Sequence, residues 1–232
     1  MAVRHDEEAG AATRSGDPPG GPGGEARARP GRSQVREENE RLILEAAEGV
    51  FAELGFKGAT TGAIAERAKL PKANVHYYFP SKEDLYREVM ARVLERWLAA
   101  ADSLDDSDDP ADALGRYIAA KMELSRTNPL GSRIFASEIM RGAPAIEDHL
   151  ETTLRNWLVS RSAIVRRWAE QGKIADVDPK ALFYLIWAAT QHYADFARQI
   201  EVLNDGRPLS DAQWSEATRQ VTQMILRGVL AR

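Results

Sequence analysis

The chain has 232 residues, a formal net charge of −4, no cysteine and four scattered histidines. The lack of cysteine excludes disulfides and thiolate metal sites, and the histidines show no metal-ligand spacing. No apolar run approaches the roughly 18 residues that span a bilayer, and no signal peptide precedes the body. We therefore expect a soluble, cytoplasmic protein that uses no metal or other cofactor.

Residues 1–32 hold seven glycines, four prolines and few large apolar residues. Such a segment buries too little surface to offset the entropy lost on ordering, so it predicts a disordered tail. Four arginines lie near its end: Arg27, Arg29, Arg32 and Arg36. They could form a flexible arm that reaches DNA, and the alternative is a solvated tail without a partner.

Residues 33–80 carry the pattern of three helices. Apolar residues at helical spacing predict the first helix from about Ser33 to Leu54, and Gly55 ends it. Thr60 and Thr61 can accept the free backbone N–H groups at the start of the second helix. That helix ends before a proline, because the residue ahead of a proline is pushed out of the helical region.

The third helix of this segment runs from Lys72 to Phe79 and follows Pro71. Its spacing buries Val75 and Phe79. The side chains left facing outward or sideways are small, polar and aromatic, and they are Lys72, Ala73, Asn74, His76, Tyr77 and Tyr78. The second and third helices, joined by a tight turn, form a helix-turn-helix. A short helix with such a surface is expected to contact a partner.

Charge is unevenly distributed along the chain. Between Lys57 and Lys82 there are five basic residues and one acidic residue, Glu66. Local potential rather than net charge governs contact with phosphate, so this segment is the candidate anion-binding surface.

The remainder of the chain predicts helices only. The expected ranges are 81–103, 111–127, 130–141, 144–171, 180–203 and 210–229, and no segment shows sustained strand-like alternation. An acidic stretch at 102–110 lacks the central glycine and terminal glutamate of a calcium loop, so it predicts a plain loop. The fold class is therefore all-α with about nine helices. We expect a helix-turn-helix domain at 33–80 and a larger helical domain at 81–232.

The N-terminal helices resemble those of the TetR family of bacterial transcriptional regulators. The match is carried by Ile43, Leu44, Ala46, Ala47, Phe51, Gly55, Phe56, Thr60, Thr61, Ile64, Ala65, Lys72, Tyr78, Phe79, Ser81, Lys82 and Glu83. The chain departs from the common family pattern at Pro71 and His76. The C-terminal part is similar to the family branch that contains pyrimidine-utilisation repressors. The matching stretches are 117–118, 123–126, 132–135, 142–144, 172–173, 178–179 and 187–196.

Side-chain chemistry and the resemblance together indicate which residues bind DNA. Lys72 can donate to guanine, Asn74 can pair with adenine or hold a phosphate, and Ala73 can meet a thymine methyl group. The resemblance places four more residues at phosphate-contacting positions: Thr61, His76, Tyr77 and Lys82. The alternative interpretation of Tyr77, Tyr78 and Phe79 is that they are core aromatics.

The resemblance also implies a homodimer on palindromic double-stranded DNA, built from the last two long helices. Their apolar residues are Phe183, Ile186, Ala194, Ala197, Val221, Ile225 and Val229. A monomer core could use the same residues instead.

The expected effector is a small molecule, with uracil or a related planar base as the candidate. Trp187 could stack on such a base and Gln191 could pair with its edge. The candidate ligand-binding residues are Trp97, Trp187, Gln191 and Asp195. His192 and Asp195 could instead be satisfied core or interface groups, and Trp97 could be plain core.

Two other functions remain open. An activator would share the same fold. A helical enzyme would need His192 with Asp195 or Glu138 as acid–base groups, but no nucleophile, metal set or phosphate loop accompanies these residues. We therefore expect a ligand-responsive repressor and not an enzyme.

Overall fold

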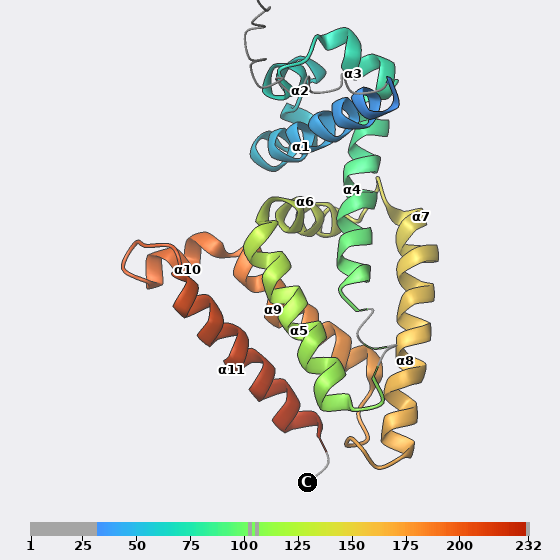
Figure 1. Ribbon diagram of the computed structural model, residues 1–232, viewed down its shortest axis with the longest axis vertical. Coiled ribbons are helices and arrows are strands. Elements are labelled where there is room, and N and C mark those ends of the chain that lie inside the picture. Colours follow the sequence, from blue (N-terminus) through green and yellow to red (C-terminus); the bar gives the residue numbers. More distant parts are fainter. Residues whose placement is uncertain (1–31, 102–103, 105–106, 231–232) are drawn as a thin grey trace, which may run out of the picture.

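The computed structural model describes residues 32–101, 104 and 107–230, and its elements in this part of the chain are helices (Figure 1). A single antiparallel bridge joins Ile174 to Leu230. None of the described helices is long and apolar enough to cross a membrane. The tail expected at 1–32 lies outside the described residues, except that the first helix begins at Arg32.

Three helices form the N-terminal head: α1 (Arg32–Gly58), α2 (Thr61–Ala68) and α3 (Lys72–Tyr78). The α1 helix is interrupted at Gly55, whose φ of 67° lies in the left-handed region that glycine adopts without strain. The Thr60 hydroxyl caps α2 by accepting the N–H of Ala63 at 3.1 Å. These local signals confirm the predicted helix-turn-helix.

The body follows through α4 (Lys82–Ala99), which runs from the head into the lower helices (Figure 1). The body helices are α5 (Pro110–Thr127), α6 (Pro129–Met140), α7 (Glu147–His149), η2 (Leu150–Leu154), α8 (Arg155–Glu170), α9 (Pro179–Asp195), α10 (Ala197–Leu203) and α11 (Asp211–Val229). Side chains of Ser81, Asp109, Asn128, Asp178 and Ser210 cap the helices that follow them.

Two helices that the sequence predicts as continuous are divided. The segment expected at 144–171 consists of α7, the π-helical η2 and α8. The segment expected at 180–203 breaks at Phe196, where φ is −112° and ψ is 27°. Neither break has a proline or glycine, so helical periodicity alone does not reveal it. These two divisions account for the difference from the expected nine helices.

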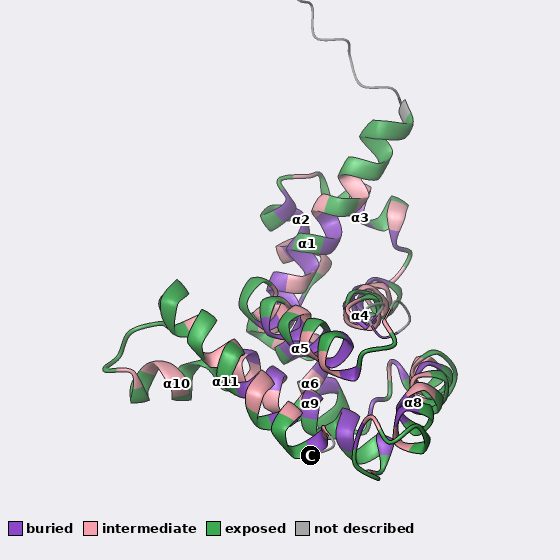
Figure 2. Cartoon of the chain, turned by 60° about the horizontal axis from the view of Figure 1, so that its bottom comes forward, coloured by how far each residue is buried: buried purple, intermediate pink, exposed green. Residues whose placement is uncertain are grey.

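Two hydrophobic clusters hold the chain together. The first joins the head to α4, to Ile134 and Phe135 of α6, and to Ile146 before α7. The second lies in the body, around Tyr117 and Trp168, and draws on α5, α8, α9 and α11. Figure 2 shows the buried residues on the sides of the helices that face one another. Because α6 contributes to the head cluster while packing on α9, it connects the head to the body.

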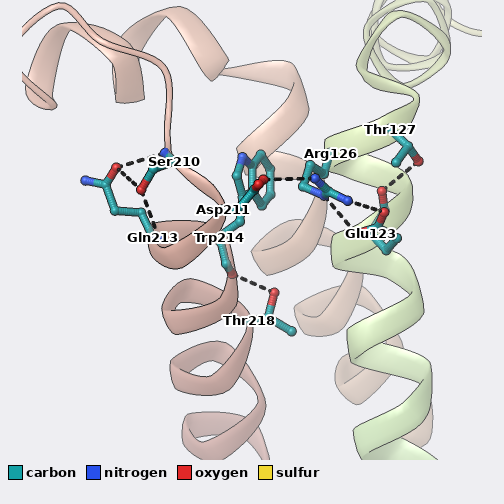
Figure 3. Close-up of polar contacts among 8 residues, drawn as sticks. All are labelled: Glu123, Arg126, Thr127, Ser210, Asp211, Gln213, Trp214 and Thr218. Carbon is teal, nitrogen blue, oxygen red and sulfur yellow. Dashed lines mark hydrogen bonds and ion pairs between the residues drawn. The ribbon is translucent and has the colours of Figure 1, made fainter.

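Polar contacts fix α11 against α5 (Figure 3). Arg126 of α5 pairs with Glu123 at 2.8 Å and with Asp211 of α11 at 3.2 Å. Ser210 and Gln213 form a reciprocal capping box at the start of α11. These contacts are exposed, so they set orientation more than stability.

The interpretation of the apolar residues on the last helices needs correction. Six of the seven residues expected at a dimer surface are buried in the chain's own core: Phe183, Ile186, Ala194, Val221, Ile225 and Val229. Ala197 is exposed. The monomer-core alternative therefore holds for those six. The large apolar residues that α9 and α11 leave exposed are Tyr184, Leu185 and Met224.

Candidate nucleic-acid interface and body cavity

The α3 helix is anchored by one side and exposed on the other. Val75 is fully buried and Phe79 nearly so, as the spacing predicts. On the outer side Lys72, Ala73, His76 and Tyr77 are exposed and Asn74 is half-buried. Tyr77 stands out because 73% of its surface is exposed, although tyrosine is usually largely covered. The helix thus presents a fixed row of side chains to a partner.

Two further candidate residues lie beside this row. Thr61, at the start of α2, places its hydroxyl 3.4 Å from Nε2 of His76. The structure therefore brings Thr61 and His76 together although 15 positions separate them. Tyr78 is half-buried and packs against the head core, with its ring 5.2 Å from that of Tyr77. The core interpretation holds for Tyr78 and Phe79 but not for Tyr77.

Lys82 differs from Lys72 in its surroundings. Its Nζ donates to the backbone carbonyls of Phe56 at 2.9 Å and Ala59 at 3.1 Å, and lies 4.5 Å from the centre of the Phe56 ring. Lys82 therefore ties the start of α4 to the turn ahead of α2. By contrast, Lys72 makes no ion pair with any described residue and is exposed.

The body contains a cavity of about 830 Å³ between α4, α5, α6, η2 and α9. All four residues proposed from the sequence for ligand binding line it: Trp97, Trp187, Gln191 and Asp195. His192 does not line it; its ring stacks on Phe196 with centroids 4.9 Å apart. Four further lining residues were not predicted from the sequence: Tyr117, Lys121, Arg133 and Tyr184.

A buried lysine and a half-buried carboxylate lie at one end of this cavity. Only 3% of the Lys121 surface is exposed, and its Nζ lies 4.2 Å from the centre of the Trp97 ring. Burial lowers the pKa of Lys121 to about 7, and the charge of Asp195 opposes this change. Burial likewise raises the pKa of Asp195, against the hydrogen bond that Ser132 donates at 2.5 Å. Lys121 is thus poised between charged and neutral forms.

We predict that Lys121→Met stabilises the protein by about 1–3 kcal/mol at pH 6. With its folded pKa lowered from 10.5 to about 7, Lys121 binds more protons in the unfolded chain between those values. The free energy of unfolding of the wild type therefore rises with pH between about 7 and 10.5 because of this residue. Below pH 7 the full cost of burying the charged ammonium is present. Urea unfolding between pH 6 and pH 9.5 measures the effect. If the free energies of unfolding of the wild type and Lys121→Met changed with pH in parallel, this prediction would be contradicted.

Aromatic rings form one wall of the cavity. Trp187 donates from Nε1 to the Tyr117 hydroxyl at 2.7 Å, and burial raises the pKa of that tyrosine. Trp97 meets Phe135 edge-on at 4.8 Å between ring centres. Rings held by such contacts give a ligand a preformed surface.

A buried carboxylate joins the head side of α6 to α4. Only 2% of the Glu138 surface is exposed. The carboxylate accepts hydrogen bonds from the Tyr86 hydroxyl at 3.0 Å, from Arg141 at 2.9 Å and from the Ala145 N–H at 2.8 Å. Tyr86 also packs edge-on against Phe51 of α1. Glu138 therefore holds α6 to α4, and Tyr86 extends this link to Phe51 of the head. The hydrogen-bond partners described for Glu138 do not include His192.

Comparison with known proteins agrees with this architecture. Residues 43–89 match the family model described as bacterial regulatory proteins, tetR family, and residues 90–232 match that of the YcdC-like protein, C-terminal region. The chain is 37% identical to the HTH-type transcriptional regulator RutR of Escherichia coli K12, over 87% of this chain and 95% of that protein. It is 25% identical to the uncharacterized regulator YhgD of Bacillus subtilis, over 64% and 78% of the two chains.

Solved structures share the fold. A TetR family transcription regulator from Marinobacter aquaeolei VT8 superposes with a TM-score of 0.64 at 21% identity, covering 86% of this chain and all of that one. The ketosteroid regulator KstR2 of Mycobacterium tuberculosis superposes with a TM-score of 0.64 at 22% identity, covering 83% of this chain and 95% of that one. These relatives are regulators and not enzymes. The chain belongs to the TetR family of helix-turn-helix transcriptional regulators.

Proposed function

We propose that this regulator is a repressor that leaves its operator when a small molecule fills the body cavity. The observation that carries the proposal is the pairing of an anchored, outward-facing α3 with a preformed cavity that shares α4 and α6 with the head. We take residues 33–80 as the DNA-binding domain and 81–232 as the ligand-binding and dimerisation domain. We place the protein in the bacterial cytoplasm, where its DNA target lies.

In this proposal α3 enters the major groove. Lys72 donates to guanine, Asn74 pairs with adenine or holds a phosphate, and Ala73 meets a thymine methyl group. His76 and Tyr77 contact phosphates on either side of these bases, together with Thr61.

Lys82 has a different role from the others. Because its ammonium is held by two backbone carbonyls, it positions the start of α4 against the turn that precedes Thr61. Its positive charge still adds to the local potential that attracts DNA.

We further propose a homodimer formed through α9 and α11. A groove of about 560 Å³ lies between these helices, and the exposed Leu185 and Met224 flank it. Small residues, Ala181, Ala189 and Gly228, also line this groove and allow close approach of a partner helix. Two heads held in this way would read a palindromic operator in successive major grooves.

The variant Leu185→Asp with Met224→Asp tests the dimer. We expect a folded monomer, because both side chains are exposed in the isolated chain. Loss of the linked second head should weaken operator binding by about 100-fold or more. Sedimentation equilibrium and DNA titration measure both effects. Val159→Asp is the matched control, since it changes an exposed apolar residue of α8. A dimeric double variant would refute the assigned interface.

Uracil or a related planar base is the effector suggested by the resemblance. Trp187 and Gln191 line the same cavity, which supports a site for stacking and edge pairing. Tryptophan fluorescence with uracil and thymine tests this choice, since Trp97 and Trp187 would report binding directly. No change at millimolar concentration would point to another effector.

Binding to the DNA upstream of the chain's own gene tests the regulator itself. We expect affinity that falls steeply with salt, because phosphate contacts release counterions. Transcription in vitro then separates the two modes: a repressor lowers transcript in the absence of effector, whereas an activator raises it. Affinity independent of salt and of DNA sequence would contradict operator recognition.

A further inference from the structure

The two ends of the body cavity differ in chemistry. At one end, Ser132 at the start of α6 is hydrogen-bonded to Asp195 at the end of α9, and the charges of Lys121 and Arg133 act on that same carboxylate. The larger aliphatic side chains that α4, α6 and η2 contribute to the cavity are Leu94, Leu98, Ile139, Met140, Leu150 and Leu154. From Arg133 to Met140 the α6 helix rises by about 10 Å, so the apolar end of the cavity at Ile139 and Met140 is well separated from the charged end.

Lys121 is 97% buried, and its Nζ faces the ring of Trp97 at 4.2 Å from the ring centre. The charge of Asp195 acts on Lys121, but the hydrogen bond described for that carboxylate comes from Ser132. A buried ammonium without an acceptor is costly, and the face of Trp97 compensates only in part. Lys121 lines the cavity, so an oxygen atom of a bound ligand would supply such an acceptor.

A bare pyrimidine ring would use only part of this space. The cavity of about 830 Å³ is of the size that holds a drug-sized ligand. A ring stacked at Trp187 and Gln191 would leave the apolar end vacant. The apolar side chains at that end would then face water, which would find few polar partners among them. The apolar end therefore favours a ligand with an apolar part.

We propose that this cavity takes an amphipathic effector in place of the planar base suggested by the resemblance. Its anionic head, such as a carboxylate, is bound at Lys121 and Arg133, and its apolar part extends along α6 to Ile139 and Met140. The proposal rests on the proposed function only in taking this cavity as the effector site. The exposed apolar side chains of Ile139, Met140, Tyr184 and Phe196 also line the cavity and mark its opening to solvent.

The test titrates the full chain with acetate, hexanoate, octanoate, 1-octanol and uracil, below micelle concentrations, and follows tryptophan fluorescence. We expect the affinity for carboxylates to rise from acetate to octanoate by up to about fourfold per methylene. Octanol, which has the same tail without the charge, should bind at least about tenfold more weakly than octanoate. Affinity independent of chain length, or uracil binding more tightly than octanoate, would overturn the proposal.

Two variants separate the two ends of the cavity. Lys121→Met should weaken octanoate binding by about tenfold or more and octanol binding distinctly less, because octanoate loses a charge-assisted contact and octanol only a neutral one. Met140→Glu, at a site 82% exposed, should weaken octanoate and leave acetate unaffected. Equal octanoate affinity in the wild type and Lys121→Met would overturn the head assignment.

The same preparations are also titrated with the upstream DNA fragment, so that the two proposals fail separately. Octanoate binding by a chain that ignores this DNA would refute the proposed function and support the cavity assignment. If the protein recognises the DNA but binds carboxylates of all lengths equally well, the cavity assignment is refuted and the proposed function is supported.

Discussion

A protein that carries Lys72→Ala and Tyr77→Ala is expected to bind its operator at least about 30-fold more weakly than the wild type. Each substitution removes a contact worth about 1–3 kcal/mol: a base-edge donor at Lys72 and a phosphate contact at Tyr77. Both side chains are exposed, and Tyr77 is 73% exposed, so the loss should not reflect unfolding. Fluorescence anisotropy with labelled operator DNA at fixed salt measures the change.

The single variants and a control separate base reading from charge. Lys72→Ala alone should relax the preference for one base pair, whereas Tyr77→Ala should weaken binding to all sequences similarly. Lys180→Ala removes the same charge from an exposed position at the start of α9 and should leave operator binding unchanged. The free energy of unfolding of each of these proteins should lie within about 0.5 kcal/mol of that of the wild type. Undiminished binding by the double variant would refute α3 as the reading helix.

Glu138→Ala is expected to lower the free energy of unfolding by about 2–4 kcal/mol. The substitution deprives the Tyr86 hydroxyl, Arg141 and the Ala145 N–H of a shared acceptor in a site that is 2% exposed. Urea unfolding at pH 7 measures the loss. An Ala variant as stable as the wild type would show that Glu138 does not join head and body.

Two milder variants identify which part of the contact matters. Glu138→Gln keeps the size of the side chain and an acceptor, so its cost should be smaller than that of Glu138→Ala. Tyr86→Phe removes the bond to α6 but keeps the ring against Phe51, and should cost about 1 kcal/mol. Both side chains lie between the head and α6, so either variant should also change how strongly ligand affects DNA binding.

The head was predictable because its signals are local. Gly55, Thr60 and Pro71 mark helix ends through backbone and capping chemistry that acts over a few residues. The exposed row on α3 follows from the spacing around Val75. Only the engagement of the Lys82 ammonium was hidden, because its acceptors lie 26 and 23 residues away.

The cavity was predictable in part. Gln191 and Asp195 were found because they are polar residues within an apolar helix. Lys121 carries the same signal on the buried side of α5, between Tyr117 and Ser125, but helical spacing does not show that this side faces a cavity. That Arg133 of α6 lies at the same end depends on how α5, α6 and α9 pack. Periodicity does not contain this information.

The apolar residues of the last helices illustrate a further limit. Helical spacing places Phe183 and Ile186 on one side of α9, but it does not say whether that side faces the chain's own core or a partner. Both are fully buried within the chain, and Leu185 is the residue left exposed. The break at Phe196 is likewise not marked by a proline or glycine in the sequence.

The operator affinity of the full chain, measured with and without a saturating cavity ligand, tests the central claim most directly. The ligand is whichever of octanoate and uracil binds more tightly in the fluorescence titration. We predict that its presence weakens operator binding by about 5- to 150-fold, the range of typical allosteric coupling, and that operator DNA weakens ligand binding by the same factor. A ligand that saturates the cavity and leaves operator affinity unchanged would contradict the account.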